Sequence, residues 1–493
     1  METKTNYKKT TLSGIMWKFL EKIGTQLIST IVSIIFARIL IPEDYGVVAL
    51  TTIFISIANV FVISGFGAAL VQKKDSDELD FSSIFYTSLV VSLVLYAGLF
   101  FAAPYIAQWF NEPLLSPILR VIGLKLPISA LSSVQSAYIS KHFLFRKTFL
   151  STLLSTIISG AVGIWMALNG FGPWALVAQT LIAVITSQIV LLITVRWHPK
   201  LIYSFKRTKS LFGFSWKLLG SNLLDATYNE LSSVIIGKKY SAVDLAYYNK
   251  GKTLPSLAGD NLNTPINAVL FPVMAAEQDD KPRVKHMARR SIQTSCYLMF
   301  ACLGGLAAVT PVAVPVIFTA KWNESIPYMQ MLCIVYAFVP MYTANMQAIK
   351  ALGRSDLFLL LEFIKKAIGI VCLLITMWFG VFWIVFGTVV STILFSFVNA
   401  LPNKKLLKYS WFEQMKDILP YLGLALVMAI PVYMMNYLYL SLNWNMYLVL
   451  LMQVCTGAVI YVGLSIIFRV EIFRYLLGAI KEFLHKGKKG KAN

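Results

Sequence analysis

Among the charged side chains that lie inside otherwise apolar stretches of the sequence, eight give the first indication of function. Five are cations and three are carboxylates: Lys18, Arg38, Lys217, Lys250 and Lys252, and Asp225, Glu230 and Asp260. Charged groups are costly inside a bilayer unless they line a water-filled pathway or pair with one another. The cations are suited to bind an anionic group such as a diphosphate. The carboxylates are candidate proton or cation sites for energy coupling.

Lys18 belongs to a polar stripe on the first apolar segment. Its members share one helical face because they are spaced three or four residues apart. They are Lys18, Lys22, Thr25, Ser29 and Ser33. A second stripe follows about 200 residues later and consists of Lys217, Ser221, Asp225, Tyr228 and Ser232. We expect the two helices to face each other across a cavity, with Lys18 and Lys217 near its cytoplasmic mouth.

Other interpretations of these charges stay open. Lys18 lies close to the inner interface, where a lysine side chain can extend to the water. Arg38 can anchor the outer end of its helix, or pair with an acid in the turn that follows. Asp225 can form a salt bridge with Lys217 or Lys252 instead of binding a coupling ion.

The elements that position these residues are spanning helices. The chain has 493 residues, of which 57% are hydrophobic and 14% are charged, whereas soluble proteins are close to a quarter charged. Apolar runs of about 20 residues recur along the whole length, so the fold class is an all-α polytopic membrane protein with about 14 transmembrane helices. The expected spans are 14–41, 46–71, 82–108, 116–140, 147–168, 173–196, 211–237, 245–275, 291–319, 326–349, 356–378, 381–401, 418–439 and 443–468.

Positive charge is distributed unevenly between the loops. The net charge is +21, and lysines and arginines gather in every second loop. This distribution is typical of the positive-inside rule, so it argues for membrane orientation and not for nucleic-acid binding. It predicts that both termini are cytoplasmic. The basic tail at 469–493 is expected on the inner face, either bound to anionic membrane lipids or only solvated.

The sequence also contains a weak internal repeat. Gly14-x-x-Trp17-Lys18 is echoed by Gly213-x-x-Trp216-Lys217, so two six-helix lobes are expected, related by a pseudo-twofold axis along the membrane normal. The predicted parts are a first lobe at 1–197, a cytoplasmic linker at 198–210, a second lobe at 211–401, two extra helices at 402–468 and the tail at 469–493.

Motifs for other chemistries are missing from the sequence. It has no P-loop, no HExxH, no nucleophile elbow and no metal-ligand spacing among its four histidines and five cysteines. We therefore predict no catalytic residues, no metal site and no cofactor.

Several short stretches resemble one family of transporters. They are the pattern Gly14, Trp17, Gln26, Ala37, Arg38, Leu40 and Pro42-Glu43-Asp44-Tyr45-Gly46; Ser64-Gly65-Phe66-Gly67-Ala68-Ala69-Leu70-Val71-Gln72; Gly170-Phe171-Gly172-Pro173-Trp174-Ala175-Leu176-Val177; and Ala351-Leu352-Gly353-Arg354-Ser355-Asp356. Together they resemble the polysaccharide-exporter (Wzx-type flippase) branch of the multidrug/oligosaccharidyl-lipid/polysaccharide exporter superfamily. The chain departs from the family at Ala246, where relatives usually have glycine.

The resemblance implies a function as well as a fold. Such a flippase moves undecaprenyl-diphosphate-linked oligosaccharides across the bacterial inner (cytoplasmic) membrane by alternating access, for exopolysaccharide, capsule, O-antigen or teichuronic acid assembly. Its expected partners are the lipid-linked oligosaccharide, membrane lipids, and a polysaccharide polymerase and glycosyltransferases of the same pathway.

Two other functions compete with this one. A cation-coupled drug or metabolite antiporter of the same superfamily would favour a surplus of cavity carboxylates, but the five candidate cations outnumber the three candidate carboxylates. A membrane glycosyltransferase or polymerase would use Glu43 and Asp44 as an acidic pair. Such enzymes usually need a large external domain, which the short predicted loops do not provide.

Overall fold

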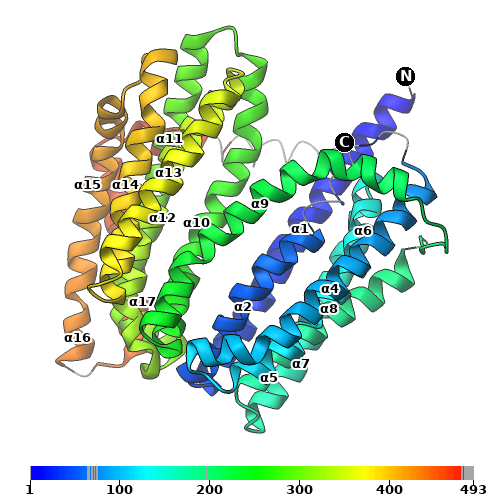
Figure 1. The fold of residues 1–493 in the computed structure, drawn as a ribbon. Coiled ribbons are helices and arrows are strands. Elements are labelled where there is room, and N and C mark those ends of the chain that lie inside the picture. Colours follow the sequence, from blue (N-terminus) through cyan, green and yellow to red (C-terminus); the bar gives the residue numbers. More distant parts are fainter. Residues whose placement is uncertain are drawn as a thin grey trace, which may run out of the picture. The chain divides into compact units, whose positions relative to one another are not determined.

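The structure is a computed structural model, and it describes residues 2–63, 67, 70, 73, 76–195, 197–442, 444–478 and 481. No strand occurs within these ranges. The chain separates into two compact units, Met1–Ala246 and Tyr247–Asn493, whose helices are labelled in Figure 1. Most of the family-like stretch at 64–72, and most of the tail beyond residue 478, lie outside the described residues.

The first unit contains eight labelled helices and the first turn of a ninth. They are α1 (Glu2–Ile39), α2 (Pro42–Ile63), α4 (Glu78–Phe110), α5 (Leu115–Ile122), α6 (Lys125–Lys141), α7 (Phe145–Leu168), α8 (Pro173–Thr194), α9 (Phe205–Lys239) and the start of α10 (Ala242–Ala276). The second unit contains the rest of α10, α11 (Lys281–Phe318), the 3-10 helix η1 (Ala320–Ser325), α12 (Ile326–Ala351), α13 (Ser355–Thr376), α14 (Val381–Leu406), α15 (Trp411–Met434), α16 (Asn436–Leu440) and α17 (Met446–Ile467).

Eleven helical segments in the described part are long and apolar enough to cross a membrane. This confirms the prediction of a multi-pass, all-helical membrane protein. The remaining predicted spans, 211–237, 245–275 and 356–378, are also helical and lie in α9, α10 and α13. Each of these three helices contains several charged residues. The fourteen-span total and the symmetry of the two lobes therefore remain predictions.

Small residues bring α1 close to α7 in the first unit. A Cβ atom added at Gly160 of α7 would lie 2.7 Å from Val32, and one added at Gly163 would lie 2.7 Å from Phe36. Both partners are buried side chains of α1. Close helix approach through small residues is typical of membrane helices, because lipid provides no hydrophobic drive for packing. The contact fixes one face of α1 and leaves its polar stripe on another.

The long helix α9 packs on α2 and α4 within the same unit. A Cβ atom added at Gly237 would lie 2.4 Å from Leu50 of α2 and 3.4 Å from Phe110 of α4. The repeat assigns α9 to the second predicted lobe, whereas these contacts join it to the first compact unit. The predicted lobe boundaries remain a prediction.

The core of the second unit combines an apolar cluster with buried amides. Side chains of α11, α12, α15 and α17 form the cluster, which includes Phe300, Met341 and Met428. Beside it lie three amide side chains with no exposed surface, Asn345, Asn403 and Gln414. They join α12, α14 and α15 through hydrogen bonds of 2.7–3.0 Å, so polar groups as well as apolar packing fix the arrangement of these helices.

Candidate functional site

The predicted stripe on α1 is exposed at Lys18, Lys22 and Ser29 and half-buried at Thr25 and Ser33. Lys18 is exposed and forms an ion pair of 2.9 Å with Glu21, one turn later. Glu21 in turn accepts a hydrogen bond of 3.3 Å from Thr152 of α7. Trp17 packs its ring 5.4 Å from that of Phe149. The α1–α7 contact therefore holds the start of α1 in a fixed rotation, with the Lys18 ammonium group on the exposed side.

The stripe on α9 is exposed over most of its length. Lys217, Ser221 and Asp225 are all exposed. Glu230 is half-buried, and its carboxylate accepts a hydrogen bond of 2.9 Å from Ser56 of α2. This hydrogen bond holds the Glu230 carboxylate against α2, where α9 packs on that helix.

Arg38, near the outer end of α1, is also exposed. The first unit thus contains five of the eight predicted site residues: Lys18, Arg38, Lys217, Asp225 and Glu230. None of their predicted roles in cargo binding or coupling is tested by this geometry. It does place the basic and hydroxyl groups of two long helices on exposed faces of one unit.

The remaining predicted residues lie on α10 in the second unit. Lys252 and Asp260 are exposed. Lys250 is only 4% exposed, and its ammonium group lies 5.0 Å from the ring centroid of Phe318 and 4.8 Å from that of Trp322. Aromatic faces stabilise a cation that has lost its water. Among the three α10 residues, Lys250 is therefore enclosed, whereas its two neighbours are accessible.

The turn at residues 42–46 has a structural role that the sequence did not reveal. A Cβ atom added at Gly46 would lie 2.2 Å from the backbone oxygen of Ala242. Ala242 is the first residue of α10. Asp44 accepts a hydrogen bond of 3.3 Å from the amide of Ile41, and a Cβ atom at Gly172 would lie 3.1 Å from Asp44. The turn therefore joins the starts of α2, α8 and α10.

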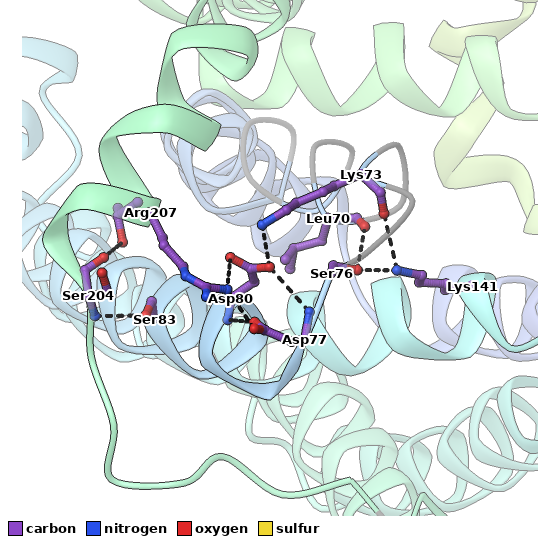
Figure 2. A network of polar contacts seen from close by, with 10 residues as sticks. Leu70, Lys73, Ser76, Asp77, Asp80, Ser83, Lys141, Ser204 and Arg207 are labelled. Carbon is purple, nitrogen blue, oxygen red and sulfur yellow. Dashed lines mark hydrogen bonds and ion pairs between the residues drawn. The ribbon is translucent and has the colours of Figure 1, made fainter.

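A second polar cluster lies at the start of α4. It is named the polar clamp here and consists of Lys73, Asp77, Asp80 and Arg207. Figure 2 shows Lys73 and Arg207 converging on Asp80, whose side chain has no exposed surface. Lys73 donates at 2.5 Å and Arg207 at 3.3 Å, while the amide of Asp77 donates at 3.2 Å. A buried carboxylate is stable only when it is compensated in this way.

The polar clamp fixes the beginning of α9. Arg207, in the first turn of α9, also donates to Asp77 at 2.6 Å. Three residues earlier, just before α9 begins, the amide of Ser204 donates to Ser83 of α4 at 2.9 Å. Lys141, the last residue of α6, contacts Ser76 and donates to the Lys73 carbonyl at 3.1 Å. The polar clamp thus joins α4 to α9, and Lys141 attaches α6 to the clamp residue Lys73.

Electrostatics at the clamp favour charged Asp77. The amide of Asp80 donates to its carboxylate at 3.0 Å, and Arg207 adds a positive charge. Together these interactions lower the pKa of Asp77 below its usual value, and the same carboxylate raises the pKa of Arg207. The spacing Asp77-x-x-Asp80 before an apolar run is a capping-box pattern, so the cap was recognisable in the sequence. Its ion pair with a residue 130 positions later was not.

Charged residues without an assigned role also have contacts. Arg120 donates to the Phe100 carbonyl at 3.2 Å and stacks 4.5 Å from its ring. Lys365 pairs with Glu362 at 2.7 Å. Within the described residues, no group of three or more His, Cys, Asp and Glu side chains could hold a metal ion.

Comparison with known proteins adds family information to this geometry. Residues 35–327 match a family described as polysaccharide biosynthesis protein. The chain is 24% identical over 486 residues to the succinoglycan biosynthesis transport protein ExoT of Rhizobium meliloti, and the match covers 96% of each chain. It is 21% identical over 336 residues to the lipopolysaccharide biosynthesis protein WzxC of Escherichia coli, covering 66% of this chain and 67% of that one.

A solved structure supports the fold. The lipid II flippase MurJ, in an inward closed conformation, matches with a TM-score of 0.75 and covers 94% of this chain and 100% of its own. The two sequences are only 14% identical, so the similarity concerns the fold. All three proteins cover long parts of the chain, including both compact units.

Proposed function

Because the chain belongs to the polysaccharide biosynthesis protein family, as a transporter of the Wzx type and not an enzyme, we propose that it is a flippase for lipid-linked oligosaccharides. It moves undecaprenyl-diphosphate-linked repeat units from the cytoplasmic to the outer leaflet of the bacterial inner membrane by alternating access. The carrier, the direction and the alternating access belong to the proposal.

The observation that carries this proposal is the exposed polar stripe on α1 and α9. Each stripe starts with an exposed lysine, Lys18 or Lys217, and carries hydroxyl groups on the same helical face, together with Lys22 on α1 and Asp225 on α9. A diphosphate has about two negative charges, and lysines in a poorly hydrated cavity bind it more strongly than lysines in bulk water. The hydroxyls are suited to exchange hydrogen bonds with sugar rings as the cargo passes.

The membrane arrangement is part of the same proposal. We infer that α9, α10 and α13 cross the bilayer with the other helices, which gives fourteen spans in two six-helix lobes and two additional C-terminal helices. Both α9 and α10 have 35 residues, or roughly 52 Å at 1.5 Å per residue, and are long enough to span. The predicted lobes, 1–197 and 211–401, are followed by helices at 402–468, and the positive-inside rule supports cytoplasmic termini.

Replacing both stripe lysines tests the proposal. The variant Lys18→Ala with Lys217→Ala should lower surface polysaccharide at least tenfold and leave lipid-linked repeat units in the inner leaflet, because the cargo's diphosphate loses about 1.5–3 kcal/mol per charge-assisted contact. Lys18→Arg with Lys217→Arg should retain export, since it keeps both charges. Surface polysaccharide and membrane protein level are measured together.

A matched control removes two lysines elsewhere. Lys404 and Lys405 are exposed residues at the end of α14, so Lys404→Ala with Lys405→Ala should leave export unchanged. Normal polysaccharide from a stably inserted Lys18→Ala, Lys217→Ala double variant would exclude the stripe as the cargo surface. If that variant instead changed only the efflux of cationic drugs, the antiporter alternative would replace the flippase.

A further inference from the structure

A groove of about 510 Å³ lies between α10, α11 and the segment after α17. One wall is apolar and comes from α10, where Ile266, Val269 and Val273 line it. The opposite wall comes from the first turns of α11 and is mixed: it contains His286, Arg290, Ser291, Thr294 and Ser295 beside the apolar Met287. Tyr475 lines the groove beside Arg290. The groove is therefore amphipathic across its width.

This character distinguishes the groove from another large cavity of the second unit. That cavity, of about 570 Å³, is lined by apolar side chains such as Phe300, Phe338 and Leu426. It offers no charged side chain, whereas the groove between α10 and α11 has a guanidinium group and a row of hydroxyls. A ligand that fits the groove must have a charged group next to a hydrocarbon part.

The ion pair at Arg290 is easily exchanged. Its guanidinium group pairs with Glu471 at 2.7 Å, but the Glu471 side chain is 83% exposed. An ion pair in that setting contributes about 0–1 kcal/mol, because water screens it. The adjacent Arg289 is different: its partner Asp417 is 7% exposed and also accepts a hydrogen bond of 2.7 Å from Tyr409.

Arg290 is thus held in one orientation, while its guanidinium group can still bind another anion. Its guanidinium group lies 4.1 Å from the ring of Tyr475, which orients the planar group across the end of the groove. Next to Tyr475, Ile472 has no exposed surface and fixes this segment to the core. A guanidinium fork can bind phosphate through two parallel hydrogen bonds, and the carboxylate that phosphate would replace, Glu471, is largely exposed.

Positive side chains are concentrated at the start of α11, and Arg290 is the one among them that lines the groove, while Arg283, Lys285 and Arg289 pair with acids elsewhere. The first ten residues of α11, KPRVKHMARR, contain five lysines and arginines and no acidic residue. Their position, at the end of a spanning helix in a predicted cytoplasmic loop, is where anionic lipid headgroups concentrate positive side chains. Beyond Arg290, Ser291 and Thr294 offer hydroxyl donors, and the α10 wall offers apolar side chains.

From these features we infer that the groove binds one anionic phospholipid of the surrounding leaflet. The lipid's phosphate lies at Arg290 in place of Glu471, its ester oxygens face Ser291 and Thr294, and an acyl chain lies along Val269 and Val273. This site is separate from the stripes proposed for cargo, and its binding does not depend on the transport function.

Two variants with opposite effects test the site. Arg290→Gln should weaken binding of phosphatidylglycerol about tenfold or more, because it removes the charge-assisted contact. Glu471→Gln should strengthen the same binding, because it removes the competing carboxylate. If the Arg290–Glu471 pair were only structural, the two substitutions would have similar effects. Binding is measured on the full chain in detergent by native mass spectrometry during lipid titration.

Arg354 provides the matched control. It also pairs with an exposed carboxylate, Asp356, at 2.6 Å, so Arg354→Gln should bind phosphatidylglycerol as the unaltered chain does. Phosphatidylcholine with the same acyl chains should bind more weakly than phosphatidylglycerol. Equal binding of the two lipids, unchanged binding by Arg290→Gln, or weaker binding by Glu471→Gln would each overturn the inference.

Two further arms identify the source of the phosphate. Glycerol phosphate, which has no acyl chain, should not displace the lipid. If glycerol phosphate did displace the lipid, the groove would be a site for soluble anions. A lipid-linked oligosaccharide should leave the bound phospholipid in place. If it removed one phospholipid per molecule bound, the groove would belong to the cargo pathway and the lipid assignment would be wrong.

Discussion

At the scale of single residues, the close contact between Gly46 and the backbone of Ala242 explains why the 42–46 motif ends in glycine. We predict that Gly46→Ala lowers the free energy of unfolding by about 1–3 kcal/mol, because its Cβ would lie 2.2 Å from a backbone oxygen that cannot move freely. The usual gain of about 1 kcal/mol for alanine over glycine in a helix is too small to offset this clash. Thermal unfolding in detergent measures the change.

The control for this substitution is Gly98. It is helical like Gly46, but it is exposed and has nothing within 4 Å of an added Cβ. Gly98→Ala should be neutral or stabilising by up to about 1 kcal/mol. If both alanine variants had the same stability, the contact with Ala242 would not explain the glycine.

A second prediction at this scale concerns pH. The pKa of Asp77 is lowered in the folded chain, so its charged form contributes stability above the pKa of the unfolded chain. This contribution is lost as the pH falls through the pKa of the folded chain. Asp77→Asn retains a good helix cap but has no charge. It should therefore unfold more easily than the unaltered chain at pH 7, and the difference should shrink once the pH is brought below about 3.9, the ordinary pKa of an aspartate.

Unfolding temperatures at the two pH values check this expectation. Asp279→Asn, at an exposed position before α11, should leave the pH dependence unchanged. A stability difference at Asp77 that stayed constant with pH would show that the side chain acts only as a cap.

Single residues also show what the sequence could predict. The spacing of Lys18 to Ser33 was enough to place these side chains on one helical face. The burial of Lys250 was not predictable, because it depends on the rings of Phe318 and Trp322, which are far along the chain. Lys250 and Lys252 look equivalent in the sequence, and only tertiary packing distinguishes them.

At the scale of elements, the buried amides join α12, α14 and α15. We predict that Asn345→Ala destabilises the chain by about 1–3 kcal/mol for each amide left unpaired, since Gln414 and Asn403 both bond its side chain. Asn169→Ala, at an exposed helix end, should change stability by no more than about 0.5 kcal/mol. Equal unfolding temperatures for the two variants would contradict a stabilising role for the amide network.

Elements were predicted more reliably than their partners. Apolar runs of spanning length located the helices, because the bilayer sets that length. The packing of α9 on α2 and α4 was not predictable, since the internal repeat assigned α9 to the other lobe. Its partners depend on the shape of the notch at Gly237, and a single glycine gives no sign of what packs against it.

At the scale of the whole molecule, the loops alternate between the two sides of the membrane in the proposed topology. We predict that a cysteine at Ser441, in the exposed turn before α17, reacts with an impermeant thiol reagent in intact cells. A cysteine at Asp279 should react only after permeabilisation. Both are introduced into a chain without its five native cysteines, and labelled protein is measured on gels. Labelling of Ser441→Cys only after permeabilisation would contradict the fourteen-span arrangement.

The polar character of α9 has a consequence for how the chain is made. A segment with this many charged residues would not enter lipid unaided as it leaves the ribosome. Its notch at Gly237 fits side chains of α2 and α4, and both of those helices are synthesised before it. We therefore expect α9 to insert against a surface that is already in the membrane, so that the order of synthesis is also the order of assembly.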